Sequence, residues 1–145
     1  MAKYQFRFQS ILSVKEMLEK KIQEEISIIN LEIEKWKKQL LVISEEKNRI
    51  AKIISEGNSK VSDYQSMKMY GSHLEQQSDI AQKEIDNCLK RREQKQKELI
   101  EKKKEIKAFE TLKENDYQNY LIEERKSELK VLNEVALRNY TGEQS

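Results

Sequence analysis

Apolar residues recur along the first third of the chain at alternating steps of three and four, which is the spacing of a coiled-coil heptad. Leu18, Ile22 and Ile26 are separated by two steps of four, and this predicts a stutter that locally relaxes the supercoil. The pattern therefore predicts one long helix over residues 9–55. Its predicted contact row is Phe8, Ile11, Lys15, Leu18, Ile22, Ile26, Ile29, Ile33, Trp36, Leu40, Ile43, Lys47, Ile50 and Ile54.

The pattern stops at a short segment rich in turn-forming residues. Gly57 suits the left-handed conformation that ends a helix, and Ser62 and Gln65 have the spacing of a capping box. We predict a turn over residues 57–61, a second helix over 62–139 and a short tail over 140–145. The contact row of the second helix is Tyr64, Met67, Tyr70 or Gly71, Leu74, Ser78, Ala81, Ile85, Cys88, Arg92, Gln96, Leu99, Ile106 and Phe109.

Folding the chain at this turn brings the two rows into register. Ile43 then faces Leu74, Ile29 faces Cys88, and the residue numbers of each facing pair sum to 117 or 118. An antiparallel arrangement requires such a constant sum. The sequence therefore predicts an all-α fold in one domain, residues 1–145, in which two long helices form an antiparallel coiled-coil hairpin. The charged fraction of 37% is also compatible with disorder, but the regular apolar spacing favours the helices.

The second helix is longer than the first, so its pairing is expected to end near residue 110. The overhang carries an apolar stripe, and an isolated helix in water is marginally stable unless such a stripe is buried. We interpret the overhang as a partner-binding helix. The alternatives are that it frays or folds back onto the amino-terminal residues. The stripe is formed by Tyr117, Tyr120, Leu121, Leu129, Leu132, Val135 and Ala136.

Residues that could carry catalysis or bind a metal are few. The chain has one histidine, His73, and one cysteine, Cys88, and its three glycines form no phosphate-binding loop. A two-helix rod also offers no concave pocket that would shift carboxylate pKa values. We therefore predict that the chain is not an enzyme and uses no cofactor and no metal.

Charge and hydropathy restrict the partners. The net charge of +2 gives little support for nucleic-acid binding. The basic residues within 90–97 and 102–104 alternate with glutamates and are interpreted as a solvated helix face, with an acidic partner as the alternative. No apolar run approaches the roughly 20 residues that span a bilayer. The single cysteine excludes an internal disulfide, and there is no secretory signal, so a soluble cytosolic protein is expected.

Both ends of the chain carry recognisable motifs. Residues 6–16 read FRFQSILSVKE, and residues 124–136 read ERKSELKVLNEVA. They resemble the aromatic-Arg-Leu/Phe-Gln opening and the Arg-x-Glu-x-Lys and Leu-Asp-Glu-x-Ala signatures of the FliJ family of the bacterial flagellar type III export apparatus. Asn133 stands where Asp is usual, and Leu129 where Gln is common.

The resemblance implies a stalk similar to the two-helix part of the γ subunit of rotary ATPases. Family members bind the hexameric export ATPase, contact the membrane export gate and escort substrate-specific export chaperones. The implied location is cytoplasmic and peripheral to the inner face of the cell membrane at the flagellar base. By position, the ATPase-binding residues are Phe6, Phe8, Ile11, Leu12, Tyr117, Tyr120, Leu121, Arg125, Leu129, Leu132, Val135 and Arg138. The gate-binding residues are Gln39, Ile43, Ile50, Tyr70 and Leu74.

Two other functions stay open at this point. The exposed stripe could bind partner helices in a groove, as an escort chaperone would. The chain could also be a generic structural coiled coil that dimerises through residues 115–139.

Overall fold

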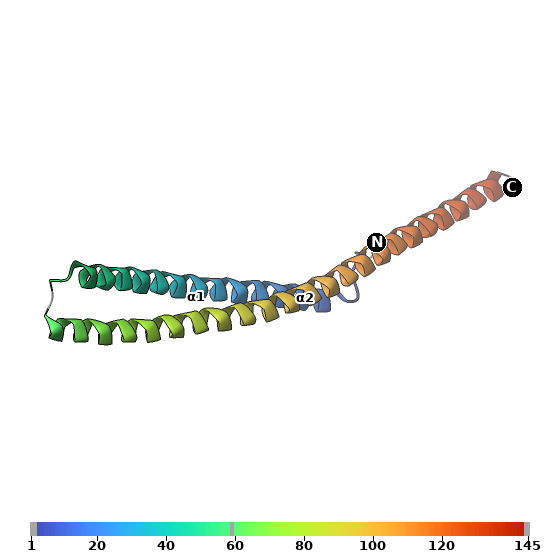
Figure 1. The fold of residues 1–145 in the computed structure, drawn as a ribbon. Coiled ribbons are helices and arrows are strands. Elements are labelled where there is room, and N and C mark those ends of the chain that lie inside the picture. Colours follow the sequence, from blue (N-terminus) through green and yellow to red (C-terminus); the bar gives the residue numbers. More distant parts are fainter. Residues whose placement is uncertain (1–2, 59, 144–145) are drawn as a thin grey trace. The chain divides into compact units, whose positions relative to one another are not determined.

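The computed structural model describes residues 3–58 and 60–143 and holds two helices joined by a short turn (Figure 1). Helix α1 spans Gln9–Glu56 and helix α2 spans Val61–Glu143. No strand occurs in the described ranges, and the predicted all-α fold of two long helices is confirmed. The predicted ranges 9–55 and 62–139 lie within these helices. Ser59 of the predicted turn and residues 144–145 of the predicted tail lie outside the described residues.

The chain divides into two compact units. The hairpin unit is Lys20–Ile100, and the terminal unit combines the described residues before and after it, 3–19 and 101–143. The assignment of the whole chain to a single domain stays a prediction.

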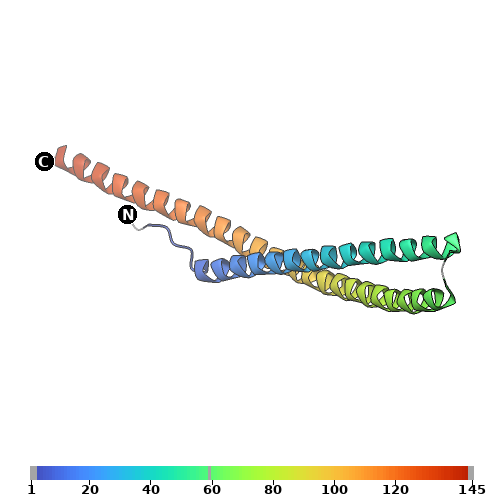
Figure 2. The same ribbon diagram turned by 90° about the vertical axis from the view of Figure 1, so that its left-hand side faces the viewer.

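The hairpin unit is held together by two apolar clusters between α1 and α2, which run side by side (Figures 1 and 2). Ile29 and Ile33 pack with the fully buried Cys88 and the half-buried Trp36. A second cluster, nearer the turn, contains Ile43, Ile50 and Leu74, with Met67 packed against it. The pairs Ile29–Cys88, Ile43–Leu74 and Ile50–Met67 each have residue numbers that sum to 117. The predicted antiparallel register is therefore confirmed in this unit.

The predicted stutter in α1 is wrong. Leu12 is only 2% exposed, whereas Ile11 is 44% exposed. Glu19 is half-buried, whereas Leu18 is 41% exposed. The contact row therefore runs through positions 12, 15, 19, 22 and 26 with steps of three and four throughout, and the heptad is unbroken.

The contact row of α2 differs from the prediction in the same way. Lys95 is half-buried and Gln96 is exposed. The Nζ atom of Lys95 lies 2.6 Å from Oε2 of Glu25 on α1. A long charged side chain can occupy a contact row when its aliphatic stem packs inward and its charge meets a partner. Apolar spacing by itself does not reveal this substitution of an ion pair for an apolar contact.

A different local feature ends α1 and begins α2 on the two sides of the turn. Gly57 has φ of 72°, as its predicted role at the end of α1 requires. The predicted capping box at Ser62 is wrong, because α2 begins two residues earlier than that motif implies. The Lys60 carbonyl accepts hydrogen bonds from the amides of Asp63 and Tyr64 at 3.0 and 3.1 Å. Asp63 Oδ2 accepts one from the Lys60 amide at 3.4 Å, and its charge suits the helix amino terminus.

Neither described helix is both long and apolar enough to cross a membrane.

Candidate functional site

The terminal unit has a small core built from both ends of the sequence. Phe6, Leu12 and Ile106 are buried, and Tyr4, Phe8 and Phe109 pack against them. Helix α1 begins at Gln9, where the Phe6 carbonyl accepts a hydrogen bond from the Gln9 amide at 3.1 Å. Residues 3–8, named here the amino-terminal segment, precede that helix and lie against α2.

Tyr4 anchors the amino-terminal segment to α2. Its ring centroid lies 5.1 Å from that of Tyr117 and 5.2 Å from that of Tyr120. The Tyr4 hydroxyl donates to Asp116 Oδ2 at 3.0 Å, and its oxygen lies 3.4 Å from the carbonyl oxygen of Lys113. Residues up to 120 of α2 therefore have a partner in their own chain. The pairing of the two helices ends near residue 110 as predicted, close to the contact of Phe8 with Phe109. The overhang does not fold back, because α2 continues as one helix. It is the amino-terminal segment that extends along α2, so the expectation that nothing in the chain contacts α2 beyond residue 110 is wrong.

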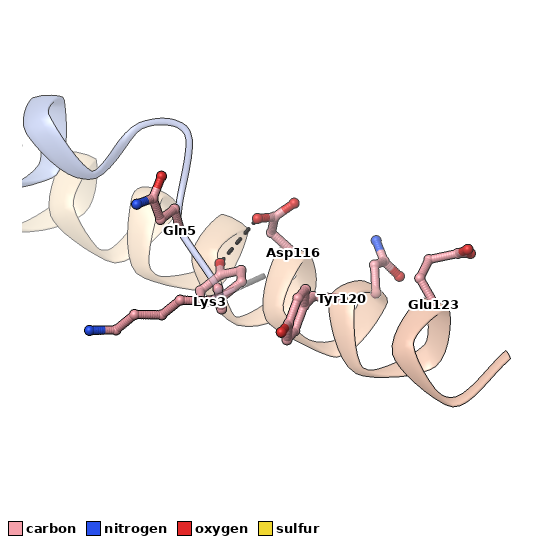
Figure 3. A pocket seen from close by; sticks show the side chains of 7 residues that line it. Lys3, Gln5, Asp116, Tyr120 and Glu123 are labelled. Carbon is pink, nitrogen blue, oxygen red and sulfur yellow. Dashed lines mark hydrogen bonds between the residues drawn. The ribbon is translucent and has the colours of Figure 1, made fainter. Parts of the chain in front are cut away.

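A shallow hollow lies between the amino-terminal segment and α2 (Figure 3). Partial burial, followed by the hydrogen bond to Asp116, raises the pKa of the Tyr4 phenol. Partial burial, followed by the nearby Glu124 carboxylate, raises the pKa of the Tyr120 phenol. Both phenols are therefore neutral at physiological pH. The hollow is lined by Lys3, Tyr4, Gln5, Asp116, Asn119, Tyr120 and Glu123.

Beyond Tyr120, α2 exposes its apolar side chains to solvent. Six of these side chains form what we name the carboxyl-terminal face, whereas the exposed Val131 and Leu137 lie outside it. At about 100° per residue, the six fall within an arc of about 140° on one side of the helix. The side chains of Leu129 and Leu132 are 54% and 63% exposed. Lys126, Lys130 and Glu134 lie on the opposite side. The face is formed by Leu121, Ile122, Leu129, Leu132, Val135 and Ala136.

The residues predicted to bind the ATPase all belong to the terminal unit, but they differ in accessibility. Phe6 and Leu12 are buried, and Phe8 and Tyr120 are half-buried. The others are exposed: Ile11, Tyr117, Leu121, Arg125, Leu129, Leu132, Val135 and Arg138.

The residues predicted to bind the export gate all belong to the hairpin unit. Ile43, Ile50 and Leu74 form one buried cluster, so their packing holds the two helices together. Gln39 is exposed. Tyr70 is 41% exposed, and its hydroxyl donates to Glu46 Oε2 at 3.3 Å. Only these two side chains are accessible to a partner.

Ion pairs across the two helices are the feature that the apolar pattern missed. Lys15 Nζ lies 2.9 Å from Glu105 Oε2 in the terminal unit, and Arg91 Nη2 lies 2.6 Å from Glu32 Oε2 in the hairpin unit. The guanidinium of Arg91 holds the pKa of the Glu32 carboxyl below its ordinary value. Within the basic runs, Arg91, Lys95, Lys97, Lys102 and Lys104 each pair with a glutamate. This pairing favours the interpretation as a solvated helix face.

Cys88 is buried between the helices of the hairpin unit. Its thiol lies 3.4 Å from Glu32 Oε2, and Arg91 Nη2 lies 3.2 Å from its sulfur. In the described part of the chain, no three His, Cys, Asp or Glu side chains gather where they could hold a metal ion.

The fold and this surface define a class, namely a two-helix coiled-coil protein with an exposed apolar helix face. The sequence model of the family described as Flagellar FliJ protein matches residues 4–145, and the chain belongs to this FliJ family. The chain is 27% identical over 146 residues to the flagellar FliJ protein of Bacillus subtilis (strain 168). That alignment covers 94% of this chain and 95% of the relative. No solved structure matches the chain significantly.

Proposed function

We propose that the chain is a non-enzymatic stalk of the flagellar type III export apparatus. In this proposal, the terminal unit binds the hexameric export ATPase and the hairpin unit contacts the membrane export gate. The chain works on the cytoplasmic side, peripheral to the membrane at the flagellar base, and also escorts substrate-specific export chaperones. Membership of a flagellar family supports the setting.

The exposed carboxyl-terminal face is the observation that carries this proposal. Fully burying an aliphatic side chain such as Leu129 or Leu132 contributes about 1.5–3 kcal/mol. The free chain leaves that contribution unused, because both side chains are more than half exposed. Arg125 lies within the arc of the face, where it can pair with a carboxylate of the partner. Such pairs affect association rate and salt dependence more than affinity.

The buried residues of the predicted ATPase site have a supporting role in this proposal. Phe6 and Leu12 are 8% and 2% exposed, so they hold the amino-terminal segment and α1 against α2. Direct contact falls to the exposed members, which are Ile11 and those between Tyr117 and Arg138. In the same way, Gln39 and Tyr70 contact the gate, while Ile43, Ile50 and Leu74 maintain the helix pair that presents them.

The proposed mechanism is mechanical coupling. The ATPase ring surrounds the end of the stalk, and asymmetric contact with the stalk biases the catalytic subunits of the ring. The stalk itself hydrolyses nothing. A two-helix coiled coil suits this role because its cross-helix contacts fix the register of the two helices.

The test is a pull-down with the cognate export ATPase. The first variant ends at Glu123, which keeps Tyr4, Tyr117 and Tyr120 and removes most of the carboxyl-terminal face. The second carries Leu129→Ser and Leu132→Ser. The matched control carries Leu31→Ser and Leu41→Ser, two exposed leucines of the hairpin unit. We expect both test variants to lose binding and the control to keep it.

If the full chain, the two test variants and the control all bind the ATPase equally, or if none of them binds it, the stalk assignment is wrong. Light scattering on the same samples addresses the alternative of a dimerising adaptor. If the full chain doubles its mass with concentration and the two test variants do not, the carboxyl-terminal face binds a second copy of this chain.

A further inference from the structure

The amino-terminal segment is tied to α2 although it forms no helix of its own. The groups that Tyr4 contacts belong to Lys113, Asp116, Tyr117 and Tyr120, which occupy two successive turns of α2. Tyr4 therefore bridges two helical turns, both through contacts of its ring and through hydrogen bonds of its hydroxyl. Tyr117 and Tyr120 also stack on each other, with centroids 6.3 Å apart and planes inclined by 21°.

A second anchor lies closer to α1. Phe6 is buried against Leu12 and Ile106 and makes an edge contact with Phe8, with ring centroids 5.8 Å apart. Lys113 Nζ donates to Gln9 Oε1 at 2.7 Å. The segment is thus fixed at Tyr4 and at Phe6, and it spans α2 from Ile106 to Tyr120.

The amino-terminal segment and the carboxyl-terminal face use different sides of α2. Lys113 and Tyr120 lie on the side of α2 that carries the segment, whereas Leu121 and Leu132 lie about 80–120° further around the helix, at about 100° per residue. Leu121 is 40% exposed although it directly follows Tyr120. The segment therefore leaves the carboxyl-terminal face open to a partner.

We propose that the amino-terminal segment is an aromatic strap that keeps α2 helical through residues 113–120 before any partner binds. A single helix in water is marginally stable, and its last packed turn decides how far it frays. With the strap in place, fraying starts beyond Tyr120 rather than beyond Phe109. The carboxyl-terminal face is then presented on a continuing helix, so a partner meets a smaller ordering cost. This last consequence rests on the proposed function, whereas the ordering of residues 113–120 does not.

Hydrogen exchange of the full chain without any partner tests the strap. In Tyr4→Ala, amides of residues 113–124 should exchange at least about tenfold faster, because two ring contacts and a hydroxyl donor are lost. Tyr4→Phe keeps the ring and should give a smaller change, about fivefold. Met69→Ala, which removes an exposed side chain of the hairpin unit, is the matched control and should change nothing in 113–124. Unchanged exchange in Tyr4→Ala overturns the proposal.

Measuring how tightly the export ATPase binds then distinguishes a strap that presents the helix from a strap that covers the binding site. If the strap presents the helix, Tyr4→Ala binds the ATPase more weakly than the wild type. Tighter binding by Tyr4→Ala would mean that the strap covers the site, and this overturns the proposed presentation of the helix to a partner. If the wild-type chain does not bind the ATPase, the proposed function fails, while the exchange result still decides whether the strap exists.

Discussion

Lys95 on α2 and Glu25 on α1 form an ion pair with Nζ and Oε2 2.6 Å apart, and Lys95 occupies the contact row of the hairpin unit. Glu25 Oε2 is shielded from water, so the ammonium group is the main compensation for its charge. The ion pair holds the pKa of the Glu25 carboxyl below its ordinary value. We expect this charge pair to favour the observed register, since a shift of either helix separates the charges.

Removing one member of this pair should destabilise the chain more than replacing both. We expect Lys95→Met to lower the midpoint of urea unfolding because it leaves the Glu25 carboxylate without its cation. The double variant Glu25→Gln with Lys95→Met should recover part of that loss. Lys37→Ala is the matched control, because Lys37 pairs with Glu34 at 3.8 Å on an exposed surface and should have little effect. Additive effects of the two substitutions would contradict the coupling.

Acid should weaken the helix pairing. Cationic partners lower the pKa of Glu25, Glu32 and Glu105 in the folded chain. Stability from a lowered carboxyl pKa is present above the unfolded value of about 4.3 and is lost as pH falls through the folded value. Thermal unfolding measured from pH 7 to pH 3 should therefore show a falling midpoint below about pH 5. The triple Glu→Gln variant at these positions should have a flatter profile, and an equally steep one would argue against this origin.

Leu12 and Ile11 are neighbours that should respond differently to truncation. Leu12→Ala removes a buried side chain from the core of the terminal unit and should cost roughly 2–4 kcal/mol. Ile11→Ala should cost less than about 1 kcal/mol, because the side chain of Ile11 is 44% exposed. Urea unfolding followed by helical circular dichroism measures both. Equal losses of stability in the two variants would contradict this assignment and support the predicted contact row with a stutter, in which Ile11 faces α2.

Replacing Gly57 or Gly71 with alanine should change the stability of the chain in opposite directions. Gly57→Ala places a side chain at φ of 72°, which should destabilise the turn by roughly 1–2 kcal/mol although the site has open space. Gly71→Ala lies inside α2, where an added Cβ meets no atom within 4 Å, and should stabilise the helix by about 0.5–1 kcal/mol. Each variant is the control for the other, and a loss of stability in both would show that residue 71 needs glycine for packing.

The sequence by itself determined the all-α fold and the register of the hairpin unit. Heptad spacing placed Ile43 opposite Leu74 and Ile29 opposite Cys88, and the residue type at position 57 located the turn. These features are local or periodic, so apolar spacing and backbone preference are enough to reveal them. The exposed carboxyl-terminal face was also predictable, because no second row of matching length exists in the chain.

Only the tertiary structure decided that Lys95 enters the contact row, which carboxylates pair with the charged side chains of the rows, and where the amino-terminal segment lies. Lys95 replaces Gln96 in the row because Glu25 meets it from the other helix, and apolar spacing does not record charge partners. Tyr4 binds Tyr117 and Asp116 across more than 100 residues of sequence. The segment that carries Tyr4 has no helical period, so its position depends on ring and hydroxyl contacts that form only when both ends of the chain are brought together.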